Sequence, residues 1–181
     1  MSTWHLVALA LLAVLAFWMV GAYNRLVALR NAVAAAWQQV DEALARRGEA
    51  VGPLVAALRG GLDGEGASLD ALLTGQARVA AAADALRGLA VRADSAQALA
   101  RAESAMASAS ARVLALLELH PELREDPAAA GPSATLREVE PRLAFARQVF
   151  NESVQAYNEA VRQWPTRALA HLYGFGTAGR L

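Results

Sequence analysis

The sequence contains no cysteine and no lysine, and only three of its 181 residues are histidine. Without cysteine the chain can form no disulfide, no thiolate metal site and no cysteine nucleophile. The absence leaves the cellular compartment open, because such a chain tolerates either redox environment. Its 17 arginines balance 17 acidic residues. This zero net charge lacks the basic surplus of a nucleic-acid-binding protein, so no nucleic-acid partner is expected.

Aspartate, glutamate, lysine and arginine are also absent from Trp4 to Tyr23, where His5 is the one histidine. About 20 residues, each rising 1.5 Å in a helix, span a hydrocarbon core of roughly 30 Å. Trp4, Trp18 and Tyr23 lie near the two ends of this run, where amphipathic rings favour the membrane interface. Residues 1–23 are therefore predicted to form a transmembrane anchor.

A cleaved signal peptide is the alternative interpretation of this run. The small residues Val20-Gly21-Ala22 would suit a cleavage site. However, no lysine or arginine precedes the run, whereas secretory signals normally begin with positive charge. The helical pattern also continues past Ala22 without a turn residue, which favours an uncleaved anchor.

Beyond the anchor, apolar residues recur three and four positions apart, the spacing of helices that pack along a seam. The first helix is predicted to run unbroken from the membrane into the bundle, since a lone Gly21 costs only about 1 kcal/mol relative to alanine. Gly60 and the glycines that follow it end this helix. Its seam contains Leu26, Leu29, Val33, Trp37, Val40, Leu44, Val51, Leu54 and Leu58.

Two shorter helices follow. Ser68 is predicted to cap the second helix, whose exit near Gly88 is uncertain. The polar break from Arg92 to Ser95 then offers Asp94 or Ser95 as the cap of the third helix. Pro121 ends this third helix, because residues before proline are pushed out of the α region.

Residues 126–132 are predicted to form the longest loop, because they contain two prolines and a glycine. Ser133 or Thr135 would open the fourth helix, and Pro165 would end it. The seam of this helix is predicted to contain Leu143, Phe150, Tyr157 and Trp164, at seven-residue intervals.

The predicted fold class is all-α, with a single N-terminal transmembrane helix that continues into an antiparallel up-and-down four-helix bundle. Residues 1–23 form the anchor, residues 24–165 the bundle, and residues 166–181 a short amphipathic and aromatic tail. Because an even number of helices returns the chain to its origin, residues 164–175 are predicted to lie beside Tyr23 and Asn24. There they would either lie at the membrane surface or cap the bundle core against the base of the first helix.

Arg47 falls in the seven-residue series Leu26, Val33, Val40, Arg47, Leu54, where an ideal seam would point it inward. An unpaired charge is costly there, so a buried Arg47 would need a carboxylate, with Glu140 or Glu152 as candidates. Alternatively, its side chain reaches water along the edge of the seam. We favour this second arrangement.

The sequence shows no arrangement that indicates catalysis or a cofactor. His5, His120 and His171 are far apart along the predicted fold, and Pro121 breaks the helix between Glu118, His120 and Glu122. Metal ligands on a helix need spacings of three or four residues, so no metal site is expected. The glycines of residues 60–66 lack the lysine and hydroxyl residue of a phosphate-binding loop. No cofactor is expected, and the chain is not expected to be an enzyme.

Two long motifs resemble the LemA family. The first begins with Tyr23-Asn24-x-Leu26-Val27-x-Leu29-Arg30-Asn31 and continues through Ala36-Trp37, Val40-Asp41 and Leu44-x-Arg46-Arg47. The second contains His120-Pro121-x-Leu123, Glu140, Arg142, Ala146-Arg147, Phe150-Asn151, Tyr157-Asn158 and Leu172-Tyr173-Gly174-Phe175. The resemblance spans nearly the whole chain and implies a membrane-anchored helical bundle of bacteria with no established catalytic activity.

Twelve residues combine a place in these motifs or the seam with polar or aromatic character, and are candidates for structural or interaction roles. They are Tyr23, Asn24, Arg30, Asn31, Trp37, Asp41, Arg47, Glu140, Arg147, Asn151, Tyr157 and Asn158.

The favoured function is a non-catalytic scaffold or interaction protein at the bacterial inner membrane. Its partners would be the lipid bilayer, other membrane or membrane-proximal proteins, and copies of itself. Arg25 and Arg30 follow the apolar run and no arginine precedes it, which favours a bundle on the cytoplasmic side and leaves the periplasmic side open. Two alternatives remain: a membrane-associated enzyme or enzyme regulator using Asp41, Arg47 and Glu140, and a cleaved soluble bundle that binds a ligand between its helices.

Overall fold

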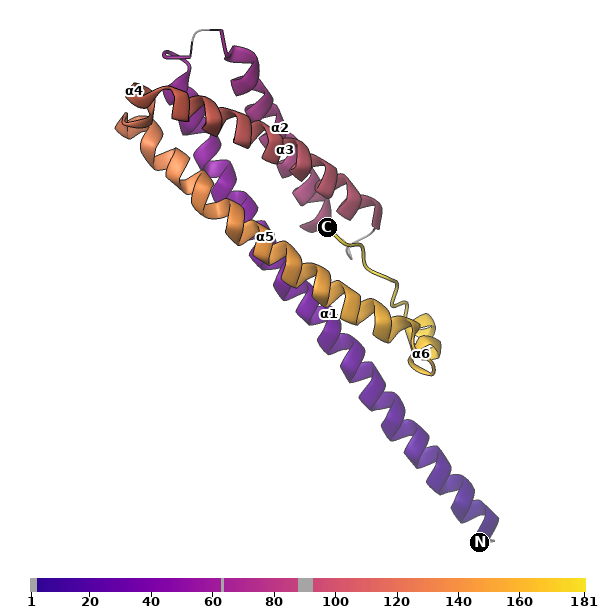
Figure 1. Cartoon of the computed structure of the whole chain (residues 1–181). Helices are drawn as coiled ribbons and strands as arrows, with labels where there is room; N and C mark the ends of the chain where they lie inside the picture. The colour runs from indigo at the N-terminus through magenta and orange to yellow at the C-terminus, as the bar shows by residue number, and fades with distance from the viewer. Residues whose placement is uncertain (1–2, 63, 88–92) are drawn as a thin grey trace.

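The computed structural model describes residues 3–62, 64–87 and 93–181, and within these ranges all regular structure is helical. The helices are α1 (Thr3–Leu58), α2 (Gly66–Arg87), α3 (Ala93–Leu119), α4 (Pro121–Arg124), α5 (Pro127–Arg162) and α6 (Thr166–Leu172). α1 packs chiefly on α5 and α2 chiefly on α3, and α2 also contacts α1 (Figure 1). The prediction of an all-α bundle on a long apolar N-terminal helix is confirmed.

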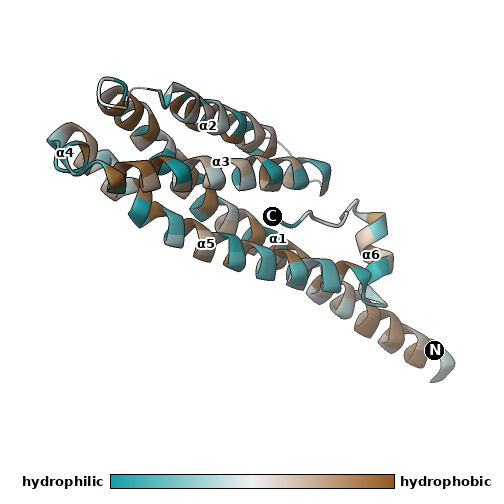
Figure 2. Ribbon diagram, turned by 45° about the horizontal axis from the view of Figure 1, so that its top comes forward, coloured by the Kyte–Doolittle hydropathy of each residue, from teal (hydrophilic) through white to brown (hydrophobic). Residues whose placement is uncertain are grey.

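α1 is one continuous helix of 56 residues, about 84 Å long at 1.5 Å per residue. Gly21 does not interrupt it, as predicted. Its N-terminal part projects beyond the bundle and is hydrophobic, whereas the bundle helices mix hydrophobic and hydrophilic residues (Figure 2). This is the one helix, among the residues described, that is long and apolar enough to cross a membrane, and no residue of its most apolar window is buried. From Leu26 onward one face of the same helix is buried in the bundle.

The core follows the predicted seams for most of their length. Leu143, Phe150 and Tyr157 of α5 are buried against α1, as their seven-residue spacing predicts. The prediction for Trp164 is wrong: this side chain is 82% exposed. α5 ends at Arg162, because Pro165 cannot continue a helix and disfavours helical geometry in the residue before it. Trp164 therefore lies outside the helical repeat that the other three residues follow.

The start of α5 also differs from the prediction. Residues 127–132 are helical rather than a loop, and α5 begins at Pro127. The Asp126 carboxylate accepts a hydrogen bond from the Ala128 amide at 2.9 Å, which caps the helix. Proline at the first helical position lacks only an N–H that would be unpaired there anyway, and the alanines that follow favour helix.

Ser133 and Thr135 are consequently interior residues of α5 rather than its cap. Ser133 donates a hydrogen bond to the Ala130 carbonyl at 3.0 Å, and Thr135 donates to the Gly131 carbonyl at 3.2 Å. Both hydroxyls therefore bond to carbonyls of the preceding turn, as such side chains do within helices.

The ends of α2 and α3 agree with the sequence in part. α2 begins at Gly66, two residues before the predicted cap, and the Ser68 hydroxyl instead donates to the Glu65 carboxylate at 2.8 Å. α3 begins at Ala93 with Asp94 in its first turn, and ends at Leu119 before Pro121 as predicted. The predicted exit at Gly88 and the break at Arg92 lie outside the described residues.

Candidate functional site

The C-terminal segment lies against the point where the apolar run of α1 ends. The Tyr23 ring is 5.2 Å from the Tyr173 ring and 6.1 Å from the Phe175 ring, measured between centroids. Residues 173–175 follow α6, which itself contacts both α1 and α5. The predicted position of this segment beside Tyr23 is confirmed, and its contact with lipid remains a prediction.

The last residues of the chain run back along α5, held by two asparagines (Figure 1). The Asn158 side chain donates to the Ala178 carbonyl at 2.9 Å and accepts from the Ala178 amide at 2.8 Å. Asn151, two turns earlier, makes the same pair of bonds with Leu181, at 2.6 and 2.8 Å. These two candidate residues therefore fix the C-terminal segment to α5. Each side-chain amide bonds to both the N–H and the C=O group of one residue in that segment.

The Arg47 side chain is completely buried, so the favoured prediction that it reaches water is wrong. Its guanidinium forms an ion pair with both carboxylate oxygens of Glu103 on α3, with one contact at 3.2 Å. Glu140 of α5 lies 3.5 Å away, so one of the two proposed partners is correct. Glu152 is not a partner, because it accepts a hydrogen bond from Gln148 on the exposed surface. Two carboxylates therefore compensate the buried charge.

Glu103 is the functional residue that the sequence reasoning missed. It occupies the buried face of α3 in the regular four-and-three spacing Leu99, Glu103, Met106, Ser110, Val113, Leu117. Glu103 is not among the buried positions predicted from the sequence. This spacing alone places Glu103 on the buried face of α3, where its carboxylate could pair with a buried Arg47.

A pocket of about 310 Å³ lies between α3 and α5 beside this ion pair. Its polar lining comes from Glu103, Ser104, Glu140 and Arg147. Buried polar atoms of Glu140, Arg147 and Arg47 have no hydrogen-bond partner in the described part of the chain. Arg147 of the lining and the adjacent Arg47 balance the formal charges of Glu103 and Glu140. Across residues 3–62, 64–87 and 93–181, no cluster of three potential metal ligands occurs.

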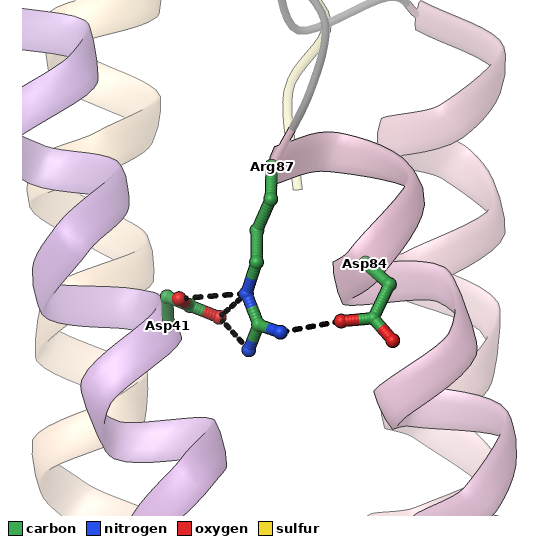
Figure 3. Close-up of polar contacts among 3 residues, drawn as sticks. All are labelled: Asp41, Asp84 and Arg87. Carbon is green, nitrogen blue, oxygen red and sulfur yellow. Dashed lines mark hydrogen bonds and ion pairs between the residues drawn. The ribbon is translucent and has the colours of Figure 1, made fainter.

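Asp41 does not join this cluster. It faces α2, where Arg87 donates to both of its carboxylate oxygens at 2.7 to 3.0 Å and also pairs with Asp84 (Figure 3). The hydrogen bonding that Arg87 donates to Asp41 is the main reason why the pKa of Arg87 is raised, and the charge of the same carboxylate adds to it. The structure therefore brings Arg47 and Glu140 together but places Asp41 elsewhere, as a tie between α1 and the end of α2.

The remaining candidates lie along the α1–α5 seam. Trp37 is buried and its ring meets Phe150 edge-on, with centroids 6.0 Å apart and planes inclined at 67°. Burial raises the pKa of the Tyr157 phenol, and the positive charge of nearby Arg30 offsets part of that rise. Arg30 itself is exposed on α1, as are Asn24 and Asn31.

Comparisons with known proteins found a family match and a partial match to a relative. The model of the LemA family matches residues 36–180. The magnetosome protein MamQ of Magnetospirillum gryphiswaldense is 32% identical over 79 residues. This match covers 44% of the present chain and 29% of MamQ, so the chain corresponds to under a third of that relative's length.

Proposed function

The chain belongs to the LemA family, and from this membership and the exposed apolar part of α1 we propose that it is a non-catalytic, membrane-anchored scaffold of the bacterial inner membrane. Its bundle would bind other membrane or membrane-proximal proteins, or further copies of the chain. The family match and the exposed apolar part of α1 both support association with a membrane.

The continuity of α1 is the observation that carries this proposal. The apolar segment and the buried face that contacts α5 belong to a single helix, Thr3–Leu58. An unbroken helix transmits position and orientation, whereas a loop after the membrane would let the bundle swing. A bundle built in this way presents its faces at a fixed height above the bilayer, which is what a scaffold requires.

The distribution of arginine supports a cytoplasmic position for the bundle. Arg25 and Arg30 lie directly after the apolar segment, and the chain before it contains no arginine or lysine. Loops that carry such an excess tend to remain on the cytoplasmic side.

A groove between α1 and α5 is the surface that best suits a protein partner. It has a volume of about 480 Å³, and α2 and α3 contribute nothing to its lining. Gln39 and Arg46 line it from α1, and Phe145 lines it from α5. Phe145 is 64% exposed. Aromatic rings at the centre of a polar surface are frequent anchors of protein interfaces.

Crosslinking from this groove tests the proposal. We expect a benzophenone maleimide attached to Gln39→Cys in the full chain to form a discrete crosslinked product in native membranes, because the chain has no other thiol. The same reagent on Ala77→Cys, an exposed position of α2, is the matched control and should give little product. Phe145→Ser should reduce the yield from Gln39→Cys about tenfold if its ring anchors the partner.

The same cysteine reports the side of the membrane. A membrane-impermeant maleimide should label Gln39→Cys only after the cells are opened. Labelling in intact spheroplasts would place the bundle outside the cytoplasm.

Equal crosslinking from Gln39→Cys and Ala77→Cys, or none from either, would contradict a partner in the α1–α5 groove.

A further inference from the structure

Charge is strongly segregated along this molecule. The sequence has no aspartate or glutamate before Asp41 and none after Glu159. Because α1 and α5 are antiparallel, these two acid-free segments meet at the end of the bundle nearest the apolar segment (Figure 1). At this end they contribute four arginines, Arg25, Arg30, Arg162 and Arg167, whereas Arg180 lies farther along α5 beside Gln155. The membrane-proximal end of the bundle is therefore positive.

The cations of α6 and the end of α5 surround a pocket. It has a volume of about 760 Å³, and Arg162, Arg167 and His171 line it together with Trp164 and Phe175. In the part of the chain that the structure describes, no carboxylate pairs with Arg162, Arg167 or His171. On the body of the bundle, by contrast, Arg46, Arg59 and Arg142 each pair with an acid.

Exposed apolar side chains adjoin these cations. Trp164 is 82% exposed and Leu172 is 72% exposed, although both belong to a segment that contacts the bundle. The contact between Tyr23 and Tyr173 places this segment level with the end of the apolar run. A positive pocket with free apolar side chains at that level has the composition of a segment that lies in the membrane interface.

We propose that this end of the bundle binds the headgroup of an anionic phospholipid. Arg162 and Arg167 contact the lipid phosphate, for which guanidinium groups are suited by their planar array of donors. Trp164 and Leu172 enter the interface beside the acyl chains. The proposal rests on the membrane anchoring proposed above, and it adds lipid specificity to that function. The cytoplasmic leaflet is the anionic one, so a cytoplasmic bundle would meet this lipid.

The test uses quenching of Trp164 fluorescence by brominated lipid. The full chain carrying Trp4→Phe and Trp18→Phe is reconstituted in vesicles of phosphatidylcholine with about 20% phosphatidylglycerol. Bromine is placed on the acyl chains of one lipid or of the other. Trp37 remains as an internal reference, because it is buried and lies about 20 Å beyond Tyr23 along α1.

We expect brominated phosphatidylglycerol to quench Trp164 fluorescence about twofold or more above the quenching expected from its mole fraction in the vesicle. Arg162→Gln with Arg167→Gln should remove this preference. Arg78→Gln with Arg101→Gln, which removes two exposed charges from α2 and α3, should preserve it. Circular dichroism of each variant confirms that the helices are intact.

Two results would overturn the proposal. Quenching by both lipids in proportion to their abundance would mean that the segment enters the interface without choosing an anionic lipid. An absence of Trp164 quenching would mean that the segment only covers the bundle. A companion protein that keeps Trp18 but carries Trp4→Phe and Trp164→Phe reports the anchor alone. Quenching of Trp18 without quenching of Trp164 would contradict the proposed lipid site and would still support the proposed membrane anchoring.

Discussion

Replacing Arg47 with methionine should lower the free energy of unfolding of the bundle by about 3–5 kcal/mol. Arg47 is completely buried, and it supplies the positive charge that compensates the buried Glu103. Its removal leaves that carboxylate in the core without its counter-ion. Urea unfolding of the full chain in detergent, followed by circular dichroism, measures the change.

A double variant separates the net contribution of the Arg47–Glu103 pair to stability from the cost of leaving one charge unpaired. Arg47→Met with Glu103→Leu removes both buried charges, and replacing a buried pair with apolar residues of similar size is often neutral or stabilising. We therefore expect this double variant to recover most of the lost stability. Glu140→Gln should cost much less than Arg47→Met, because its carboxylate is partly exposed. Wild-type stability in Arg47→Met would show that the ion pair does not hold the helices together.

Trp37→Ala should also destabilise the bundle by about 3–5 kcal/mol. The indole is buried in the α1–α5 seam and meets Phe150 edge-on, so truncation leaves a large cavity and removes an aromatic pair. Thermal unfolding of the full chain in detergent measures the loss.

Trp164→Ala is the matched control for this substitution. The Trp164 ring is 82% exposed, so its loss should change the melting temperature little. If both tryptophan variants melted at the wild-type temperature, Trp37 would not be part of the core, and the arrangement of α1 against α5 would be wrong.

The helical fold and the long N-terminal helix follow directly from the sequence. Local patterns determine them: an uncharged run sets the projecting segment, and regular spacing of residues such as Val33 and Phe150 sets the seam. The errors lie where a local signal has two meanings. Proline and glycine in residues 126–132 suggest a loop, yet Asp126 followed by proline and three alanines starts a helix equally well.

The candidate site was less predictable, because its contacts join residues far apart in the chain. Burial of Arg47 depends on Glu103, which is 56 residues away and on another helix. The asparagines Asn151 and Asn158 stand out in the sequence, but their role depends on the path of the C-terminal residues that they bind. Periodicity shows which face of a helix is buried, and it does not show which polar groups meet there.

If α1 is one rigid helix from its apolar segment into the bundle, two labels on either side of the junction keep a fixed distance. Ala10→Cys and Ala45→Cys give the cysteine-free chain two sites for spin labels, one in the apolar segment and one in the bundle. The sites are 35 residues apart. A continuous helix therefore predicts a narrow distribution of label-to-label distances centred at about 52 Å, measured in lipid nanodiscs by double electron–electron resonance. A broad distribution centred well below this distance would reveal a hinge near Gly21, and α1 would then not hold the bundle in a fixed orientation.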